Sequence, residues 1–370
     1  MSNNDLIYQI ALTKVRQIGG YHARLLLNHF DSAEQIFLAS KRQLEKIEGI
    51  GSVRASFIKS YRDFSQCESE IKKMERENIR CLFIKDNDYP KRLNEIFDAP
   101  ILIYYKGDIL LNTKKSISVV GTRSNTSYGK GVCEEIITSL SKFSVTIVSG
   151  LAYGIDTIAH QSALKNNLPT IAILAHGLDS IYPYSNKALS EQIISTGGLL
   201  TEFSLGIPPD KPNFPKRNRI TAGICDALIV IETGVKGGSL ISASIAHSYN
   251  KEVFAVPGRI NDPKNEGCNQ LIKENKAIIL TSPEDIAKEL GWDDAIKKIN
   301  TPQLSLNFEL NENEKCIINL FDNQTPLHID SILNKLKMSP GQVHHCLLNL
   351  EMRNLIKALP GKQYCIAVAN

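Results

Sequence analysis

The feature that most constrains the fold is a series of short Val/Ile-rich runs, each of which stops at a loop. The runs cover residues 116–120, 145–149, 170–174, 227–231, 253–256 and 277–280. Apolar runs without alternating polar residues are typical of strands buried on both faces, and the helical segments between them imply right-handed crossovers. The sequence therefore predicts an α/β fold built around an extended Rossmann-like parallel sheet.

The loops that follow these strands are rich in glycine and small polar residues. They include Gly121 to Arg123, Ser149 to Gly154 and Gly237 to Ser239. Because the carboxyl ends of parallel strands meet at one edge of a sheet, we expect these loops and the 213–219 segment to line one groove. Glycine lets backbone N–H groups approach a phosphate closely, although it is equally typical of tight strand-to-helix turns.

A basic cluster lies at the start of a helix expected after residue 213. Lys216, Arg217 and Arg219 follow Phe214 and an extended, proline-rich approach. Cations at a helix N-terminus oppose the partial positive charge there, so the cluster favours a polyanionic partner. A solvated basic helix face would have the same composition. Phe214 suits either base stacking or anchoring of the helix in the core.

Several enzyme classes fit the sequence poorly. No G-x-G-x-x-G follows an expected strand, which argues against a dinucleotide cofactor. Gly129-Lys130 lacks the hydroxyl of a P-loop because Gly131 follows it. Asp156 and His160 share a helix face, but a Ser-His-Asp hydrolase would also need a G-x-S-x-G elbow, and a packing role is more typical for such a histidine. We therefore expect a binding protein with no catalytic residue, metal or cofactor.

An ordered set of motifs within residues 100–290 is similar to that of one protein family. The motifs are Gly121-Thr122-Arg123, the run from Ser149 to His160, Gly177-Leu178-Asp179, Tyr182-Pro183, Glu202-Phe203, Asn213-Phe214-Pro215, Arg217-Asn218-Arg219-Ile220, Gly237-Gly238-Ser239-Leu240 and Val256-Pro257-Gly258. Together they resemble the DNA-processing protein DprA (Smf) family. Two positions depart from its usual pattern, Tyr153 and Ala175.

The resemblance implies a homodimer that binds single-stranded DNA without sequence preference. It also implies that the protein protects incoming strands and loads a RecA-type recombinase during natural transformation, with single-strand-binding protein as a further partner. The residues expected to contact the strand are Gly121, Arg123, Ser149, Gly150, Asn213, Phe214, Lys216, Arg217, Asn218, Arg219, Gly237, Gly238 and Ser239.

The alternative function is that of a Rossmann-like nucleotide-binding or nucleotide-hydrolysing enzyme, by fold analogy with phosphoribohydrolases. Those enzymes begin a helix with Gly-Gly-x-Gly-Thr-x-x-Glu. Here Gly237-Gly238-Ser239 leads to Ser242 near the position of the carboxylate. The general acid or base of that reaction is therefore missing.

The N-terminal segment predicts short helices joined by glycine turns. Gly19-Gly20 precedes an amphipathic segment over 23–30, and Gly49 to Gly51 precedes another over 53–58. This pattern resembles tandem helix-hairpin-helix (SAM-like) units, in which backbone N–H groups at the tip contact a phosphate. A small helical bundle with turning glycines is the alternative. We expect this domain to cover residues 1–66 and the Rossmann-like domain to cover 67–290.

The C-terminal segment predicts a linker over 291–308 and a winged helix over 309–370. Helices are expected over 315–321 and 328–336, then from Ser339-Pro340 to Asn354, followed by a hairpin over 355–366. Ser339 suits an N-cap and Pro340 the first helical position. The third helix is poor in the side chains that read DNA, so a DNA-binding wing and a protein-docking module stay open.

Bulk properties predict a cytoplasmic protein. The net charge of the 370 residues is only +4, so affinity for nucleic acid must come from a local patch. The eight cysteines show no C-x-x-C spacing, which is typical of reduced thiols, and we expect Cys133 and Cys225 in the core. The start of the chain is polar, and no apolar run reaches the length of a membrane span.

Overall fold

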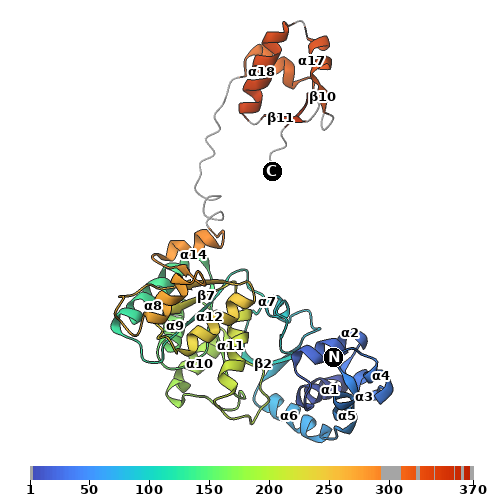
Figure 1. The fold of residues 1–370 in the computed structure, drawn as a ribbon, viewed down its shortest axis with the longest axis vertical. Coiled ribbons are helices and arrows are strands. Elements are labelled where there is room, and N and C mark those ends of the chain that lie inside the picture. The colour runs from blue at the N-terminus through green and yellow to red at the C-terminus, as the bar shows by residue number, and fades with distance from the viewer. Residues whose placement is uncertain are drawn as a thin grey trace. The chain divides into compact units, whose positions relative to one another are not determined.

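The computed structural model describes residues 3–292, 310–321, 326–336, 338–353, 355–359 and 362–366. Two compact units are present, Met1–Ile296 and Lys297–Asn370, and each has its own hydrophobic core (Figure 1). Most of the linker expected over 291–308 lies outside the described residues. No helix in the described part of the chain combines the length and apolar character needed to cross a membrane.

The first unit is built on a nine-stranded sheet with the order β1-β2-β6-β5-β4-β3-β7-β8-β9. Its parallel strands are β3 (Ser116–Gly121), β4 (Thr146–Ser149), β5 (Thr170–Ile173), β6 (Gly198–Thr201), β7 (Ala227–Ile231), β8 (Glu252–Ala255) and β9 (Ile278–Ile279). All six predicted runs are strands of this sheet, so the Rossmann-like fold class is confirmed. β1 (Arg80–Phe83) and β2 (Leu102–Gly107) extend the sheet in antiparallel pairing.

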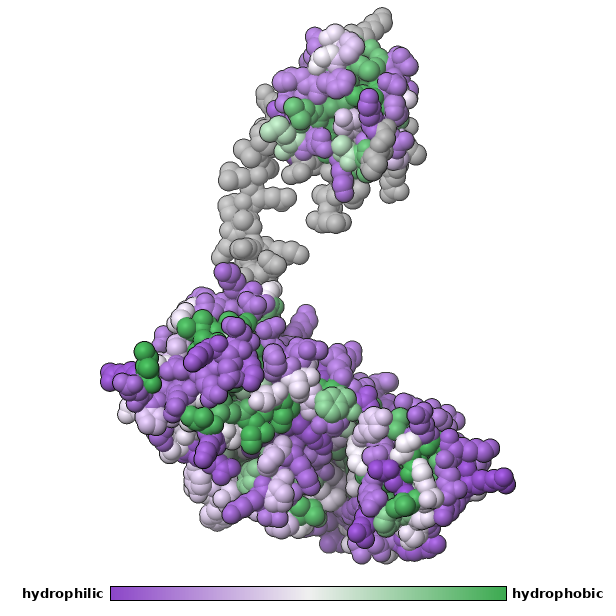
Figure 2. Space-filling view, in the orientation of Figure 1, coloured by the Kyte–Doolittle hydropathy of each residue, from purple (hydrophilic) through white to green (hydrophobic). Residues whose placement is uncertain are grey.

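Helices cover both faces of the sheet. The cluster on one face joins Ile117, Ile229 and Phe254 to α8 (Ser127–Leu140), α9 (Ile155–Lys165) and α14 (Pro283–Glu289). The cluster on the other joins Val120, Leu228 and Val230 to α11 (Asn213–Gly223), α12 (Gly238–Ser248) and α13 (Glu266–Lys273). Cys133 and Cys225 are fully buried, as predicted. Figure 2 shows an apolar strip in the region of α12, a helix without Asp, Glu, Lys or Arg.

The strand order reverses at β3, which lies between β4 and β7. From β3 the chain builds β4, β5 and β6 on one side, and it then returns to add β7, β8 and β9 on the other side. In doubly wound sheets the loops beyond the carboxyl ends of the strands separate at such a point and leave a crevice. The fold therefore places the best ligand site beyond β3, β4 and β7.

The N-terminal helices are α1 (Asn3–Lys14), α2 (Gly20–His29), α3 (Ala33–Leu38), α4 (Lys41–Glu45), α5 (Gly51–Ser60) and α6 (Phe64–Arg76). Both predicted glycine turns lie at helix starts. The first turn packs against the protein at Gly20, where a Cβ would lie 2.7 Å from the Ala99 carbonyl oxygen, whereas Gly51 in the second turn has open space beside it. Arg54 also donates to the carbonyl oxygens of Gln17 (3.3 Å) and Gly49 (3.1 Å), which links the two tips.

The boundary expected between residues 66 and 67 falls inside α6. Cys67, Ile71 and Met74 of this helix are buried in the same core cluster as Ile10 and Leu12 of α1. The same cluster includes Ile103 of β2 and Leu200 of β6, so the helical region and the sheet share one core within the first unit.

The second unit is a winged helix. Its helices are α16 (Glu312–Ile318), α17 (Ile329–Lys335) and α18 (Pro340–Met352), and its sheet has the order β10-β12-β11, with β10 (Leu327–His328), β11 (Ile356–Leu359) and β12 (Gln363–Ile366). The predicted cap is confirmed, because the Ser339 backbone N–H donates to Gln342 Oε1 at 3.0 Å and Pro340 begins α18. Ile317, Val343 and Leu350 form the centre of the core.

Candidate nucleic-acid interface

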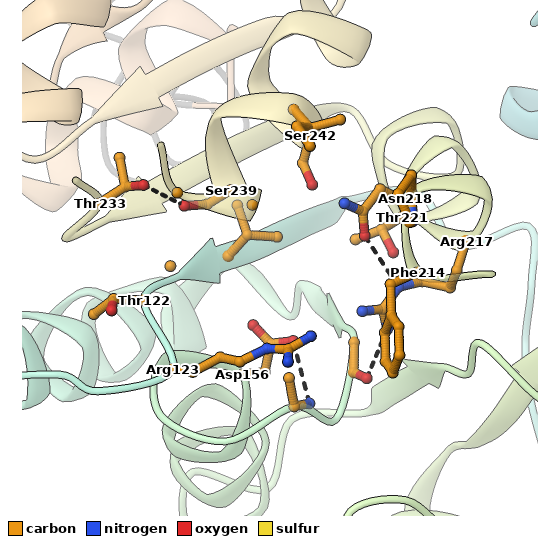
Figure 3. A pocket seen from close by; sticks show the side chains of 18 of the residues that line it. Thr122, Arg123, Asp156, Phe214, Arg217, Asn218, Thr221, Thr233, Ser239 and Ser242 are labelled. Atoms are coloured by element: carbon orange, nitrogen blue, oxygen red, sulfur yellow. Dashed lines mark hydrogen bonds between the residues drawn. The ribbon is translucent and has the colours of Figure 1, made fainter. Parts of the chain in front are cut away.

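A groove of about 300 Å3 lies at the point where the strand order reverses. Loops after β3, β4 and β7 and one face of α11 form its walls (Figure 3). The residues that line it are Val120, Gly121, Thr122, Arg123, Gly150, Ala152, Asp156, Phe214, Pro215, Arg217, Asn218, Thr221, Thr233, Gly234, Gly237, Gly238, Ser239, Ile241 and Ser242.

The loops after β3, β4 and β7 line one groove in the structure, as the sequence predicted. Gly121 continues β3 so close to β7 that a Cβ at this position would lie 2.0 Å from the Ile231 carbonyl oxygen. A Cβ on Gly150 would likewise lie 2.1 Å from Arg217 Nη1. Gly121 is needed because the backbones of β3 and β7 pass each other closely, whereas a side chain at position 150 would displace the Arg217 guanidinium from the wall. These structural reasons hold whether or not a ligand is bound.

The N-terminus of α12 faces the groove through Gly237, Gly238 and Ser239. The first N–H groups of a helix lack intrahelical partners and carry partial positive charge. Ser239 Oγ donates to Thr233 Oγ1 at 2.7 Å, so this hydroxyl fixes the loop after β7. The helix end thus offers backbone donors to an anion in the groove.

Arg123 stands exposed on the loop after β3. Its guanidinium carbon lies 5.1 Å from the centre of the Phe214 ring, which in turn meets the Tyr182 ring edge-to-face at 6.0 Å. A cation over an aromatic face is held in place without losing its charge. Arg123 and Phe214 therefore present a positive charge and an aromatic surface together at the groove.

Arg217 lines the groove, but its guanidinium is buried in the wall. Nη1 donates to the carbonyl oxygens of Gly150 (2.6 Å) and Ile173 (2.5 Å), and Nε donates to Asn218 Oδ1 at 3.2 Å. Burial lowers the pKa of Arg217, and the carboxylate of Asp156 opposes that shift. Because Nη1 and Nε already donate within the wall, Arg217 is less accessible to a phosphate than the sequence predicted.

Lys216 and Arg219 point away from the groove. They line a second cavity of about 740 Å3 between α11 and the helical region. Arg219 forms an ion pair with Glu202 and donates to the Asp98 carbonyl oxygen, whereas Lys216 is exposed. The helical period explains this correction: residues 214, 217, 218 and 221 share the face of α11 toward the groove, and the two cations lie on another face.

Ser149 and Asn213 also lie outside the groove lining. Ser149 is fully buried and its Oγ donates to the Val119 carbonyl oxygen at 2.6 Å, which ties β4 to β3. Asn213 is buried at the start of α11, where its Nδ2 donates to the Pro208 carbonyl oxygen at 3.4 Å. Both side chains support the walls, and neither is available to a ligand at the surface.

The sequence-based set of contacts omitted several residues that the groove contains. Thr122, Thr221, Thr233 and Ser242 add hydroxyl groups, and Asp156 adds a carboxylate. Burial raises the pKa of Asp156, while Arg217 and the Ala152 N–H, 3.3 Å from Oδ2, oppose that shift. The position of Asp156 in the first turn of α9 was the available signal for its role beside a helix N-terminus.

Glu232 occupies the N-terminus of α8. Its fully buried carboxylate accepts the Thr126 N–H at 2.8 Å and also the Thr126 hydroxyl. In Rossmann-like folds the helix start after the first strand is a common phosphate site. In this chain the protein's own carboxylate takes that place, which leaves no room for a phosphate there.

His160 is a packing residue, as the sequence indicated. It is fully buried, and its Nδ1 lies 2.7 Å from Thr170 Oγ1. Because Thr170 Oγ1 donates to the Ile147 carbonyl oxygen at 2.9 Å, the histidine donates from Nδ1 and Nε2 carries no proton. Burial lowers the pKa of His160 to about 3, so the ring is neutral near pH 7.

Comparison with known proteins agrees with this architecture. Residues 80–291 match the model of the family described as DNA recombination-mediator protein A, and residues 302–362 match the DprA winged helix domain. Protein Smf of Synechocystis is 31% identical over 98% of this chain and 99% of its own length. DNA processing protein DprA of Streptococcus pneumoniae is 36% identical over 77% of this chain and 98% of its own length.

Two solved structures are similar to this one at the level of the fold and the sequence. The structure of DprA from Streptococcus pneumoniae has a TM-score of 0.67 and 34% identity, and covers 76% of this chain and 97% of its own. That of DNA processing protein A from Helicobacter pylori, described for its single-stranded DNA binding mode, has a TM-score of 0.53 and 32% identity over 58% of this chain and 96% of its own. The chain therefore belongs to the DNA recombination-mediator protein A (DprA, Smf) family.

Proposed function

We propose that the groove binds single-stranded DNA without sequence preference. The observation that carries this proposal is the combination of exposed Arg123, the Phe214 ring at 5.1 Å and the N-terminus of α12 in one groove. A cation, backbone donors and an aromatic face are the contacts that hold a single strand irrespective of its bases. The relative from Helicobacter pylori, whose structure is described for binding single-stranded DNA, supports the same assignment.

The phosphate contacts are assigned to exposed cations and backbone donors. Arg123 and Lys236 serve the groove, because Lys236 is exposed on the loop whose Gly234 and Gly237 line it. Lys216, on the other face of α11, extends the positive surface toward the helical region. Such contacts position a strand without reading it, and they leave the bases accessible for pairing by a recombinase.

The groove favours a binding role over the nucleotide-processing alternative. Ser242 lines the groove near the position where phosphoribohydrolases carry a carboxylate. Asp156, the carboxylate among the lining residues, accepts the Ala152 N–H and lies beside buried Arg217. We therefore assign no catalytic residue to the groove.

In the mediator role, a homodimer in the cytoplasm protects incoming single strands and loads a RecA-type recombinase during natural transformation. It displaces single-strand-binding protein in the process. Membership of the recombination-mediator family supports this role. Two grooves in a dimer would raise the effective concentration of each site for the same strand without any new contact. Sedimentation of the protein alone and with the strand tests the dimer, and recombinase filament assembly on coated strands tests the loading step.

The salt dependence of strand binding tests the phosphate contacts. If Arg123, Lys216 and Lys236 each neutralise one phosphate, log affinity is expected to fall with log salt with a slope of about −2.1, or about −0.7 for each contact. Arg123→Ala is expected to reduce the slope to about −1.4. Anisotropy titrations of labelled oligothymidine at increasing salt measure both values. Binding that does not change with salt would show that the groove is not a phosphate site.

Removal of residues 297–370 is expected to leave strand binding largely unchanged. The first unit, Met1–Ile296, has its own core and contains the whole groove. Domains with separate cores keep their structure when the other is removed. The measurement is the affinity of the truncated and complete chains for the same oligonucleotide. If truncation abolishes binding, the winged helix is the principal DNA site and the groove assignment is wrong.

A further inference from the structure

Exposed aromatic rings are carried by the loops beside the groove. Among the described residues, the strongly exposed aromatic side chains are Tyr21, Phe97, Tyr128, Tyr153, Tyr182 and Tyr184. Three of these six, Tyr153, Tyr182 and Tyr184, lie on the loops after β4 and β5. Tyr184 is the most exposed of the six, at 76%. Exposed rings on neighbouring loops of one groove indicate a contact with another molecule more strongly than rings scattered singly over a surface.

The turn that carries Tyr182 and Tyr184 is fixed to the wall of the groove. Tyr184 begins the short 3-10 helix η2 (Tyr184–Asn186), and buried Asn186 ends it. Asn186 Nδ2 donates to the Leu151 carbonyl oxygen at 3.0 Å and to Thr157 Oγ1 at 2.8 Å. Leu151 lies between two residues that line the groove, Gly150 and Ala152. The exposed rings therefore stand on a backbone that is held in place relative to the groove.

The two tyrosines continue a path of rings and cations that begins inside the groove. Arg123 lies over the Phe214 ring at 5.1 Å, and the Phe214 and Tyr182 ring centres are 6.0 Å apart at 60°. Beyond Pro183, Lys187 Nζ lies 5.8 Å from the centre of the Tyr184 ring. The path thus consists of three aromatic rings with a positively charged side chain at each end.

We propose that Tyr182 and Tyr184 form a base-stacking platform that carries a single strand out of the groove, with Lys187 as a phosphate contact. This inference rests on the proposed function and extends its site. Optimal stacking needs about 3.5 Å between carbon atoms, so the 6.0 Å edge-to-face contact leaves no room for a base between Phe214 and Tyr182. Bases therefore stack on the outer ring faces.

The platform also provides a reason for selecting single strands. Every base has an aromatic face, so stacking on tyrosine tolerates any sequence. In a duplex those faces are covered by neighbouring base pairs and are not available to the two rings. A phosphate-only surface would lack this discrimination, since both forms of DNA present phosphates.

The test compares strands with and without bases on the complete protein. Tyr184→Ala is expected to weaken binding of an oligothymidine of about 16 nucleotides by about fivefold or more, the effect of losing one stacked base. It should leave unchanged the affinity for an abasic strand of equal length and the salt slope. Tyr184→Phe should restore binding, because it keeps the ring. Tyr21→Ala on α2, which removes an exposed ring elsewhere, is the matched control and should have no effect.

The outcomes separate this proposal from the function on which it rests. If Tyr184→Ala binds oligothymidine as well as the unaltered protein does, or loses equal affinity for the abasic strand, the stacking platform is wrong and the groove proposal stands. If the unaltered protein binds neither strand, both proposals fail. A Tyr182→Leu variant gives an independent check, and it too should lose affinity for the base-containing strand alone.

Discussion

Replacement of Arg217 by methionine is expected to lower the melting temperature of the first unit by roughly 10 °C. The substitution leaves the carbonyl oxygens of Gly150 and Ile173 without their donor and leaves buried Asp156 without its nearest compensating charge. Removing one partner of a buried charge network costs about 3–5 kcal/mol. For a domain of this size, each kcal/mol corresponds to about 2–4 °C. Calorimetry or thermal circular dichroism measures the shift.

Arg123→Ala is the matched control, because it removes the same type of side chain from the same groove. Arg123 is exposed, so its loss is expected to change stability by less than about 0.5 kcal/mol while it weakens strand binding. The pair thus separates the arginine that builds the wall from the arginine that faces the ligand. A large fall in melting temperature for Arg123→Ala and little change for Arg217→Met would reverse the two assignments.

Acid is expected to destabilise the first unit through His160. Its folded pKa of about 3 lies below the ordinary value of 6.5, so below pH 6.5 the unfolded chain binds a proton that the folded chain does not. The contribution of neutral His160 to the free energy of unfolding is therefore fully present above about pH 6.5. It decreases as the pH falls and is lost in full, by about 5 kcal/mol, only below about pH 3. Protonation of Nε2, which has no hydrogen-bond partner, would bury an unpaired donor.

The measurement is urea unfolding of the complete protein and of His160→Leu between pH 7 and pH 4. The variant is less stable at pH 7, because Thr170 Oγ1 loses a donor, but its stability should fall less on acidification. Burial also lowers the pKa of His176, and that residue is present in both proteins, so its contribution cancels in the comparison. If the free energy of unfolding falls equally in the two proteins between pH 7 and pH 4, His160 is not the cause of the acid destabilisation.

The strands could be predicted because continuous Val/Ile runs are typical of strands buried on both faces. The convergence of the loops after β3, β4 and β7 then followed from the parallel order of those strands. β6 (Gly198–Thr201) was missed, since four residues that begin with a glycine give little periodic signal. The second unit was predicted in outline, and among its described elements the two-residue strand β10 was missing from the prediction.

The sequence predicted which loops form the groove, but it did not predict which side chains of those segments face it. A cluster such as Lys216, Arg217 and Arg219 looks uniform in a sequence, but successive residues of a helix point in directions that differ by about 100°. Arg217 is therefore buried in the wall of the groove, Arg219 forms an ion pair with Glu202, and Lys216 is exposed to solvent. Glu232 could not be predicted at α8 at all, because the contact joins residues 106 positions apart in the chain.

Glu232 makes this edge of the sheet a poor site for free nucleotides. A nucleotide phosphate that approached the first turn of α8 would meet the charge of a carboxylate and donors that Thr126 has already committed. Any small ligand with affinity for the folded groove would occupy it according to the ratio of its concentration to its dissociation constant. A strand-binding protein with an open phosphate site would therefore be inhibited by the monomers of its own ligand. With the α8 start filled internally, the proposed strand affinity is expected to come from the α12 start, Arg123 and further contacts along the polymer, most of which a monomer cannot make.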